Sequence, residues 1–198
     1  MDDMQKAVKG LRKALNPDKK TPEENKALCE RFPFLSWYGD PQYIGYSEAG
    51  EPDYEYTWED ELPVGWRKAM CPQIWEDLKA ILEEANYVNQ FRFCQIKEKW
   101  GELRMYYSGL PNEIADKVYA WEDKYVKLSE EHCIGCGGET KYMTLGWITY
   151  ICEDCAKKRQ QESLRRFGDL ERVIPLEDIE EYYKNPDAYC ESHPVKEL

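Results

Sequence analysis

The stretch that decides the fold reads Cys133-Ile134-Gly135-Cys136 and, after fifteen intervening residues, Cys152-Glu153-Asp154-Cys155. Two Cys-x2-Cys pairs at this separation are typical of a site in which four thiolates bind one zinc ion. Each pair turns the chain back within four residues, so that both of its sulfurs can reach the same ion at roughly 2.3 Å.

Between the pairs, residues 142–151 are mostly aromatic or β-branched and are interrupted by Gly146, which predicts a strand, a turn and a second strand. Gly135, Gly137 and Gly138 surround the second cysteine and allow backbone amides to turn toward the sulfurs. Because four cysteines complete a tetrahedron, no position stays open for a substrate. The sequence therefore predicts a zinc ribbon with one structural Zn²⁺ bound by Cys133, Cys136, Cys152 and Cys155.

Disulfides or free thiols are the alternatives to zinc. Disulfides need an oxidising compartment, and the first residues, Met1-Asp2-Asp3-Met4-Gln5-Lys6, are charged and lack the apolar run of a secretory signal. We therefore expect a cytoplasmic, zinc-bound protein. His132 is expected as a neighbour of the full site and not as a ligand. Whether Cys190 and His193 join a second metal site stays open.

Composition and charge restrict the classes of protein to which this chain can belong. The chain has 198 residues, of which 42% are hydrophobic and 14% aromatic, and this supports a packed core. No apolar run approaches the roughly 18 residues that span a bilayer, so no membrane association is expected. The net charge of −12 disfavours general nucleic-acid binding and favours a basic protein partner, for example a host protein.

The remaining pattern predicts helices and one hairpin. Residues 2–15 fit a short helix, and Thr21-Pro22-Glu23-Glu24 has the form of a capping box that begins a second helix. Apolar spacing predicts further helices over 72–85 and 111–129, and alternation predicts a hairpin over 91–107 that turns at 98–102.

These elements predict an α+β fold: helices packed on a β-hairpin or small antiparallel sheet, with a four-cysteine zinc-ribbon subdomain. We divide the chain into N-terminal helices with an acidic aromatic segment, a helix–hairpin–helix core, the ribbon with a basic helix, and an acidic C-terminal tail. These parts span residues 1–62, 63–130, 131–168 and 169–198.

The acidic aromatic segment is a candidate surface for a basic partner. Its aromatic residues alternate with acidic ones, which in an extended strand places the two kinds on opposite faces. A solvated edge strand or an extended loop is the alternative. The candidate partner-binding residues are Asp53, Tyr54, Glu55, Tyr56, Trp58, Glu59, Asp60 and Glu61.

A basic stretch follows the last cysteine. Its positive charge is favourable beside a thiolate cluster, and it is also a candidate contact for phosphates. The residues that would make a nucleic-acid contact are Lys157, Lys158, Arg159, Arg165 and Arg166.

No catalytic residues are assigned. The chain has two histidines, which restricts the possible bases, and it has neither a phosphate-binding glycine loop nor a His-Glu-x-x-His motif. Gln95-Ile96-Lys97 at the end of a strand is similar to the last element of a metal-dependent nuclease core, so a nuclease stays as a minor alternative.

The hairpin and the ribbon together resemble a known family. Residues 95–107, which read QIKEKWGELRMYY, followed by a helix and the two cysteine pairs, are similar to uncharacterised small bacterial and phage proteins with a QxKEKxGxLRxYY hairpin before a zinc ribbon. Trp100-Gly101-Glu102 departs from the Phe-Gly-Gly expected there, so the turn geometry can differ. The resemblance implies a phage or prophage accessory protein of the bacterial cytoplasm, and it implies no activity.

The interpretation we favour is a zinc-stabilised, non-enzymatic accessory factor that binds a protein, for example a phage inhibitor of host nucleic-acid-handling or defence machinery. The alternatives are a nucleic-acid-binding zinc-ribbon protein that uses the basic helix, and the nuclease.

Overall fold

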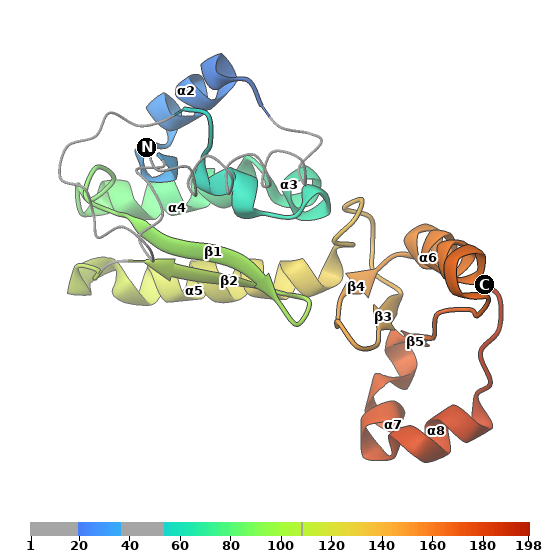
Figure 1. The fold of residues 1–198 in the computed structure, drawn as a ribbon. Helices are drawn as coiled ribbons and strands as arrows, with labels where there is room; N and C mark the ends of the chain where they lie inside the picture. The colour runs from blue at the N-terminus through green and yellow to red at the C-terminus, as the bar shows by residue number, and fades with distance from the viewer. Residues whose placement is uncertain (1–19, 37–53, 108) are drawn as a thin grey trace.

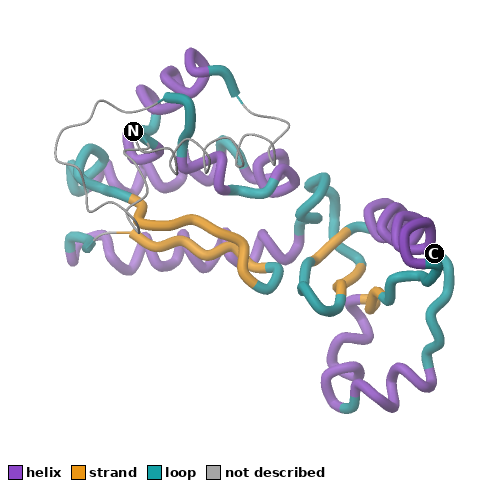
Figure 2. Tube along the Cα trace, in the orientation of Figure 1, coloured by secondary structure: helices purple, strands orange, loops and turns teal. Residues whose placement is uncertain are grey.

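The computed structural model describes residues 20–36, 54–107 and 109–198. The helix expected over 2–15 and the acidic residue Asp53 lie outside these ranges. The fold is α+β, as predicted, with helices around two small antiparallel sheets (Figures 1 and 2). One sheet has the two strands β1 and β2, and the other has three strands in the order β4-β3-β5.

The first described helix, α2 (Pro22–Arg31), begins at the predicted capping box. The Thr21 hydroxyl accepts a hydrogen bond from the Glu24 amide at 3.2 Å, and the Glu24 carboxylate accepts one from the Thr21 amide at 2.7 Å. A turn of 3-10 helix, η1 (Pro33–Leu35), follows and buries Phe34 and Leu35.

The hairpin lies among three helices. Helices α3 (Val64–Met70) and α4 (Gln73–Glu84) precede β1 (Phe93–Lys99) and β2 (Glu102–Tyr107), and α5 (Asn112–Glu131) follows. β1 and β2 pair antiparallel, and α5 packs along β2 and against α4 (Figure 1). The turn is shorter than predicted, because the strands continue to Lys99 and from Glu102.

Aromatic rings form the centre of this first core. The Phe34 ring lies 6.0 to 6.4 Å from three other rings, those of Trp75, Phe91 and Phe93, and all four side chains are buried. The Trp121 indole donates a hydrogen bond to the carbonyl of Ile74 at 2.9 Å, which links α5 to α4. Buried rings of this size contribute much of the apolar area that stabilises a domain.

One carboxylate also links α4 to α5. Asp77 of α4 accepts hydrogen bonds from the Lys124 ammonium at 2.7 Å and from the Tyr125 hydroxyl at 2.9 Å. Burial raises the pKa of Asp77, but the hydrogen bonds from Lys124, Gln73 and Tyr125 outweigh burial, and the pKa is lowered. The ionised form is therefore favoured in the folded state.

Asp77→Asn should lower the free energy of unfolding at pH 7 by about 1 kcal/mol, because charged hydrogen bonds near the surface contribute modestly. A lowered pKa gives stability that is present above the ordinary pKa of aspartate and lost as pH falls through the lowered value. The difference between wild type and variant should therefore shrink when urea unfolding is repeated below about pH 4. Asp116→Asn, at an exposed position of α5, is the control. If the difference in free energy of unfolding between wild type and Asp77→Asn did not change with pH, the ionised Asp77 would not be the source of the stability.

The C-terminal half is built on the three-stranded sheet. β3 (Tyr142–Thr144) pairs with β4 (Tyr150–Ile151), so the predicted strand–turn–strand is confirmed. Helix α6 (Glu153–Phe167) follows and ends at Gly168, whose φ is 79°. β5 (Val173–Pro175) then pairs with the free edge of β3.

The segment that we expected to be an acidic tail is folded, and it contributes helices as well as the strand β5. After β5 come the 3-10 turn η3 (Leu176–Asp178) and the helices α7 (Ile179–Lys184) and α8 (Pro186–Ser192). Buried Tyr189 packs with Met143 and Ile174 in a small apolar cluster of their own. Residues 173–192 therefore extend the ribbon sheet and cover it (Figure 1).

Candidate metal centre

The first cysteine pair lies directly after α5. The chain leaves the helix at His132, and Cys133 then begins a tight turn in which its amide donates to the Gly138 carbonyl at 2.7 Å. The Gly137 amide donates back to the Cys133 carbonyl at 2.8 Å, and Gly137 has a φ of 84° that suits glycine. The second pair begins α6, with Cys152 at its N-cap and Cys155 in its first turn.

These two elements bring the four predicted cysteines together. The Sγ atoms of Cys133, Cys136, Cys152 and Cys155 all lie within 4.8 Å of one another, and those of Cys136 and Cys152 are 3.4 Å apart. Four sulfurs bound to one ion at roughly 2.3 Å would be separated by about 3.8 Å. The four cysteines are therefore close enough to hold one metal ion.

Glycine leaves the space around the sulfurs open. A Cβ on Gly135 would lie 3.5 Å from the Sγ of Cys155, and one on Gly138 would lie 3.6 Å from the Sγ of Cys136. Both distances are ordinary van der Waals contacts, so these glycines lie directly against the sulfurs. The glycine-rich turn thus fits a cluster that needs close approach of backbone to sulfur.

The local electrostatics favour a bound cation. Burial raises the pKa of the Cys133 thiol, but backbone hydrogen bonds from Cys152, Gly135 and Cys136 outweigh burial and lower it. Burial and the neighbouring sulfurs raise the pKa of the Cys155 thiol. Since adjacent thiolates repel one another, four of them can ionise together only when a cation lies between them.

The first cysteine turn packs directly on α3. The Gly65 amide donates to the Ile134 carbonyl at 3.0 Å, and a Cβ on Gly65 would lie only 2.0 Å from the Cys133 carbonyl oxygen. A Cβ on Gly137 would lie 2.7 Å from the Gly65 carbonyl oxygen. The Trp66 indole also donates to the carbonyl of His132 at 3.1 Å. The turn that carries two of the cysteines is therefore in backbone contact with the first core.

Sequence reasoning missed Gly65 and Trp66 as parts of this site. Both lie more than 60 positions before the first cysteine, so spacing carries no signal for them. A glycine in the first turn of a short helix is a weak signal, because glycine disfavours helices unless another group needs the space.

Within residues 20–36, 54–107 and 109–198, the four cysteines are the group of His, Cys, Asp or Glu side chains that could bind a metal. His132 does not belong to this group. His193 stacks on the Tyr189 ring with the ring centroids 4.2 Å apart, and its Nδ1 lies 3.1 Å from the Ser192 hydroxyl. The open question of a second site at Cys190 and His193 finds no support in this arrangement.

The acidic aromatic segment differs from the predicted alternating strand. Trp58–Glu61 forms a 3-10 turn, η2, because the Asp60 carboxylate accepts hydrogen bonds from the Thr57 amide at 2.8 Å and from the Thr57 hydroxyl. Four of the candidate partner-binding residues are buried, namely Tyr56, Trp58, Glu59 and Asp60. Glu59 accepts a hydrogen bond from the Trp75 indole at 2.7 Å and pairs with Lys20.

Burial of these four residues limits the surface that a partner can reach. In the described part of the segment, Glu55 is exposed, and Tyr54 and Glu61 are half-buried. A role in partner binding therefore stays a prediction, carried by these three residues.

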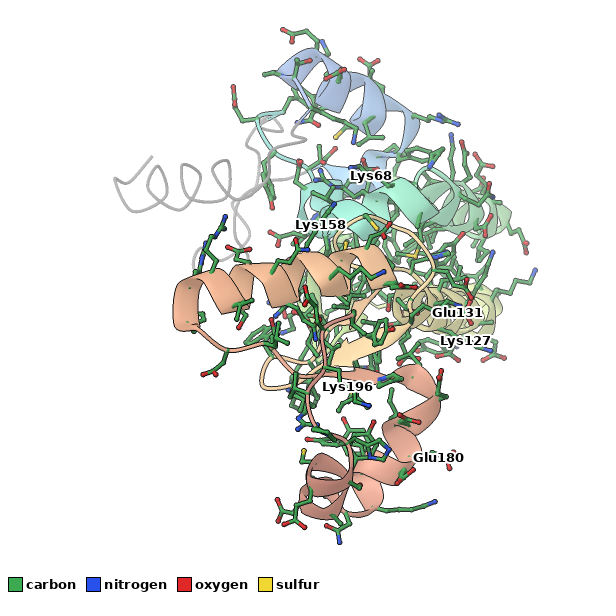
Figure 3. All side chains as sticks on the ribbon, turned by 90° about the vertical axis from the view of Figure 1, so that its right-hand side faces the viewer. Lys68, Lys127, Glu131, Lys158, Glu180 and Lys196 are labelled. Atoms are coloured by element: carbon green, nitrogen blue, oxygen red, sulfur yellow. The ribbon has the colours of Figure 1, made fainter. Side chains whose placement is uncertain are left out.

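The basic stretch lies on α6, the orange helix that runs across the middle of Figure 3. Three of its five basic residues pair with acidic ones: Lys157 with Glu153, Arg159 with Glu171, and Arg166 with Glu162. Lys158, labelled in Figure 3, and Arg165 are the other two. Ion pairing lowers the charge that α6 offers to phosphates, and a nucleic-acid contact there stays a prediction.

None of the described helices combines the length and the apolar character needed to cross a membrane. Comparison with known proteins finds no matching family model, no similar curated protein and no similar solved structure.

Proposed function

We propose that the chain is a zinc-stabilised accessory protein that binds another protein, and that its metal is structural. The observation that carries this proposal is the set of four Sγ atoms within 4.8 Å of one another. Two of them belong to the turn that packs against α3, and two belong to the start of α6. A site made only of cysteine sulfur favours zinc over magnesium or calcium, which prefer oxygen ligands. With four protein ligands, the ion has no open position for a substrate.

The metal would link the two halves of the molecule. It would join the turn after α5 to the first turn of α6, and the same turn contacts Gly65 and Trp66 of α3. Loss of the ion would therefore loosen the ribbon and its contact with the helix–hairpin–helix core. This mechanical role agrees with our division of the chain at about residue 130, which we keep as a proposal.

The partner contact would be acidic. The net charge of −12 supports a basic partner, and Tyr54, Glu55 and Glu61 are the accessible part of the segment assigned to it. A phage inhibitor of host nucleic-acid-handling or defence machinery would meet such a basic surface. The ion pairs on α6 give no reason to prefer the nucleic-acid alternative for that helix.

Metal content tests the first part of this proposal. Protein purified without added metal should contain about one zinc per chain, and Co²⁺ exchanged into it should give the visible absorption of a tetrahedral thiolate site. Cys94→Ser should keep the full zinc content, because Cys94 lies on β1 away from the cluster. Zinc-free protein with unchanged stability would contradict the proposal.

Charge reversal tests the second part. A basic partner recovered at physiological salt should be lost with Glu55→Lys/Glu61→Lys and retained with Glu113→Lys/Asp116→Lys, a matched pair of exposed acids on α5. If both double variants lost the partner equally, only the net charge of the protein would matter for binding. If both retained it equally, the acidic segment would not be part of the contact.

A further inference from the structure

The outward face of the β1–β2 hairpin is basic and aromatic. Ile96 of β1 pairs with Met105 of β2, and both are buried, so the alternate positions face outward. The outward hairpin positions carry three cations and one acid, Glu102, which pairs with Arg104. Glu130 of α5 lies beside this pair. The outward residues are Gln95, Lys97 and Lys99 on β1 and Glu102, Arg104 and Tyr106 on β2.

The turn of this hairpin holds an exposed tryptophan in an unfavourable backbone conformation. Trp100 has a φ of 56° and is 63% exposed. Glycine or asparagine adopts this conformation readily, whereas a bulky residue is strained there by roughly 1 kcal/mol. The ring therefore gains no burial that would offset the strain, and such an outlier points to a role for the side chain.

Cations already lie over the exposed rings. The Lys99 ammonium is 4.4 Å from the centroid of the Trp100 ring, and the Lys97 ammonium is 5.1 Å from that of Tyr106, which is 47% exposed. The face thus repeats a unit of one ring and one ammonium at two neighbouring places.

A second exposed tryptophan lies beside the turn. Trp147, in the loop between β3 and β4, is 71% exposed, and its indole donates to the Glu98 carboxylate at 3.1 Å. The same carboxylate accepts the Gly101 amide at 2.7 Å, so one side chain fixes both loops. In Figure 1 the hairpin turn reaches toward the ribbon.

Contact with the ribbon also makes the arrangement rigid. A Cβ on Gly101 would lie 2.9 Å from the Tyr150 ring of β4, so the turn packs closely on the ribbon sheet. The turn that presents Trp100 is in this way fixed in place, at little further loss of conformational entropy on binding.

We propose that this face binds single-stranded nucleic acid, with bases stacked on Trp100 and Tyr106 and phosphates bound by Lys97, Lys99 and Arg104. Exposed rings beside cations are the elements of sequence-tolerant single-strand recognition, because every base offers a flat face. An acidic peptide would use the cations but would leave the rings without a matching group, so we favour the nucleic acid. This binding goes beyond the proposed function.

The binding test is fluorescence anisotropy with a labelled oligothymidylate of about fifteen nucleotides, titrated with the zinc-loaded full chain. We expect binding that weakens with salt, with a logarithmic slope of about −2 for three phosphate contacts on a single strand. The same sequence as a duplex should bind more weakly, because its bases are stacked on one another.

Single-residue variants distinguish a loss of base stacking from a loss of folding. Trp100→Asn should weaken binding roughly tenfold and leave the melting temperature equal or higher, since asparagine tolerates this backbone conformation. Tyr106→Ala should weaken binding by a similar factor. Tyr119→Ala, a 53% exposed ring on α5, is the matched control and should change affinity by less than about twofold. Lys97→Gln/Lys99→Gln should reduce the salt slope by about 1.4.

Three results would overturn the proposal. The first is no binding at low salt by protein that carries zinc, a result that leaves the proposed metal site intact. The second is tighter binding of labelled polyglutamate than of the oligonucleotide, which would assign the face to an acidic peptide. The third is loss of binding in Lys158→Gln/Arg165→Gln with the hairpin variants unaffected, which would place the nucleic acid on α6.

Discussion

Cys152→Ser should release the metal and unfold the ribbon. Apparent binding free energies of structural zinc reach about 10–16 kcal/mol in small zinc domains, so even partial loss of the site should lower the free energy of unfolding by about 3 kcal/mol or more. A coloured chelator should remove zinc from the variant at concentrations that leave the wild type intact. Thermal unfolding followed by circular dichroism should show a lower melting temperature.

Cys190→Ser is the matched control, because Cys190 is also half-buried in the C-terminal half but lies outside the cluster. Its zinc content and melting temperature should remain close to those of the wild type. If the wild type were equally stable with and without the chelator, the claim that a bound metal stabilises the fold would be wrong.

Gly65→Ala should have the second large effect. The added Cβ would lie 2.0 Å from the Cys133 carbonyl oxygen and 2.6 Å from the carbonyl carbon and oxygen of Ile134. These are backbone atoms, so no side chain can rotate away to relieve the overlap. α3 and the cysteine turn must separate, and the hydrogen bond from Gly65 to Ile134 is lost, so we expect a loss of about 3 kcal/mol in urea unfolding.

Gly109→Ala is its control, since a Cβ there has no neighbour within 4 Å, and it should change stability by less than about 0.5 kcal/mol. In the Cys152→Ser background the loss from Gly65→Ala should shrink, because the turn is already released from its metal. Full additivity of the two substitutions would contradict the link between the metal and α3.

Local signals in the sequence predicted the elements that depend on near neighbours. The Thr21 and Glu24 pair indicated the start of α2, and the two cysteine pairs indicated the cluster. In each case the chemistry lies within a few residues, or the residue type itself restricts the outcome, as cysteine does at this spacing.

Features that depend on distant partners were not predictable. The alternation around Glu59 suggested a solvated face, but this carboxylate is buried because the Trp75 indole and the Lys20 ammonium bind it. β5 is also too short to show periodicity, since it has three residues, which pair with β3 from 29 to 33 positions away. Neither the Trp75 indole nor the edge of β3 is visible from the local sequence.

The metal site and the hairpin face depend on one another in this account. The turn of the hairpin packs on Tyr150 of β4, and Ile134 of the cysteine turn donates its amide to the Tyr150 carbonyl at 3.2 Å. Zinc would therefore hold the residue against which the Trp100 turn rests. Metal removal should weaken oligonucleotide binding even though the nucleic acid would not touch the ion.

Amide hydrogen exchange of the zinc-loaded protein and of the same protein after chelation tests the central claim most directly. We predict that chelation abolishes protection of Gly65, Ile134 and Thr144, whose amides donate to the cysteine turn or within the ribbon. Amides in the middle of α4 and α5 should keep most of their protection, because the aromatic core remains. Unchanged protection of Gly65 and Ile134 without metal would contradict the claim that one ion links the two halves.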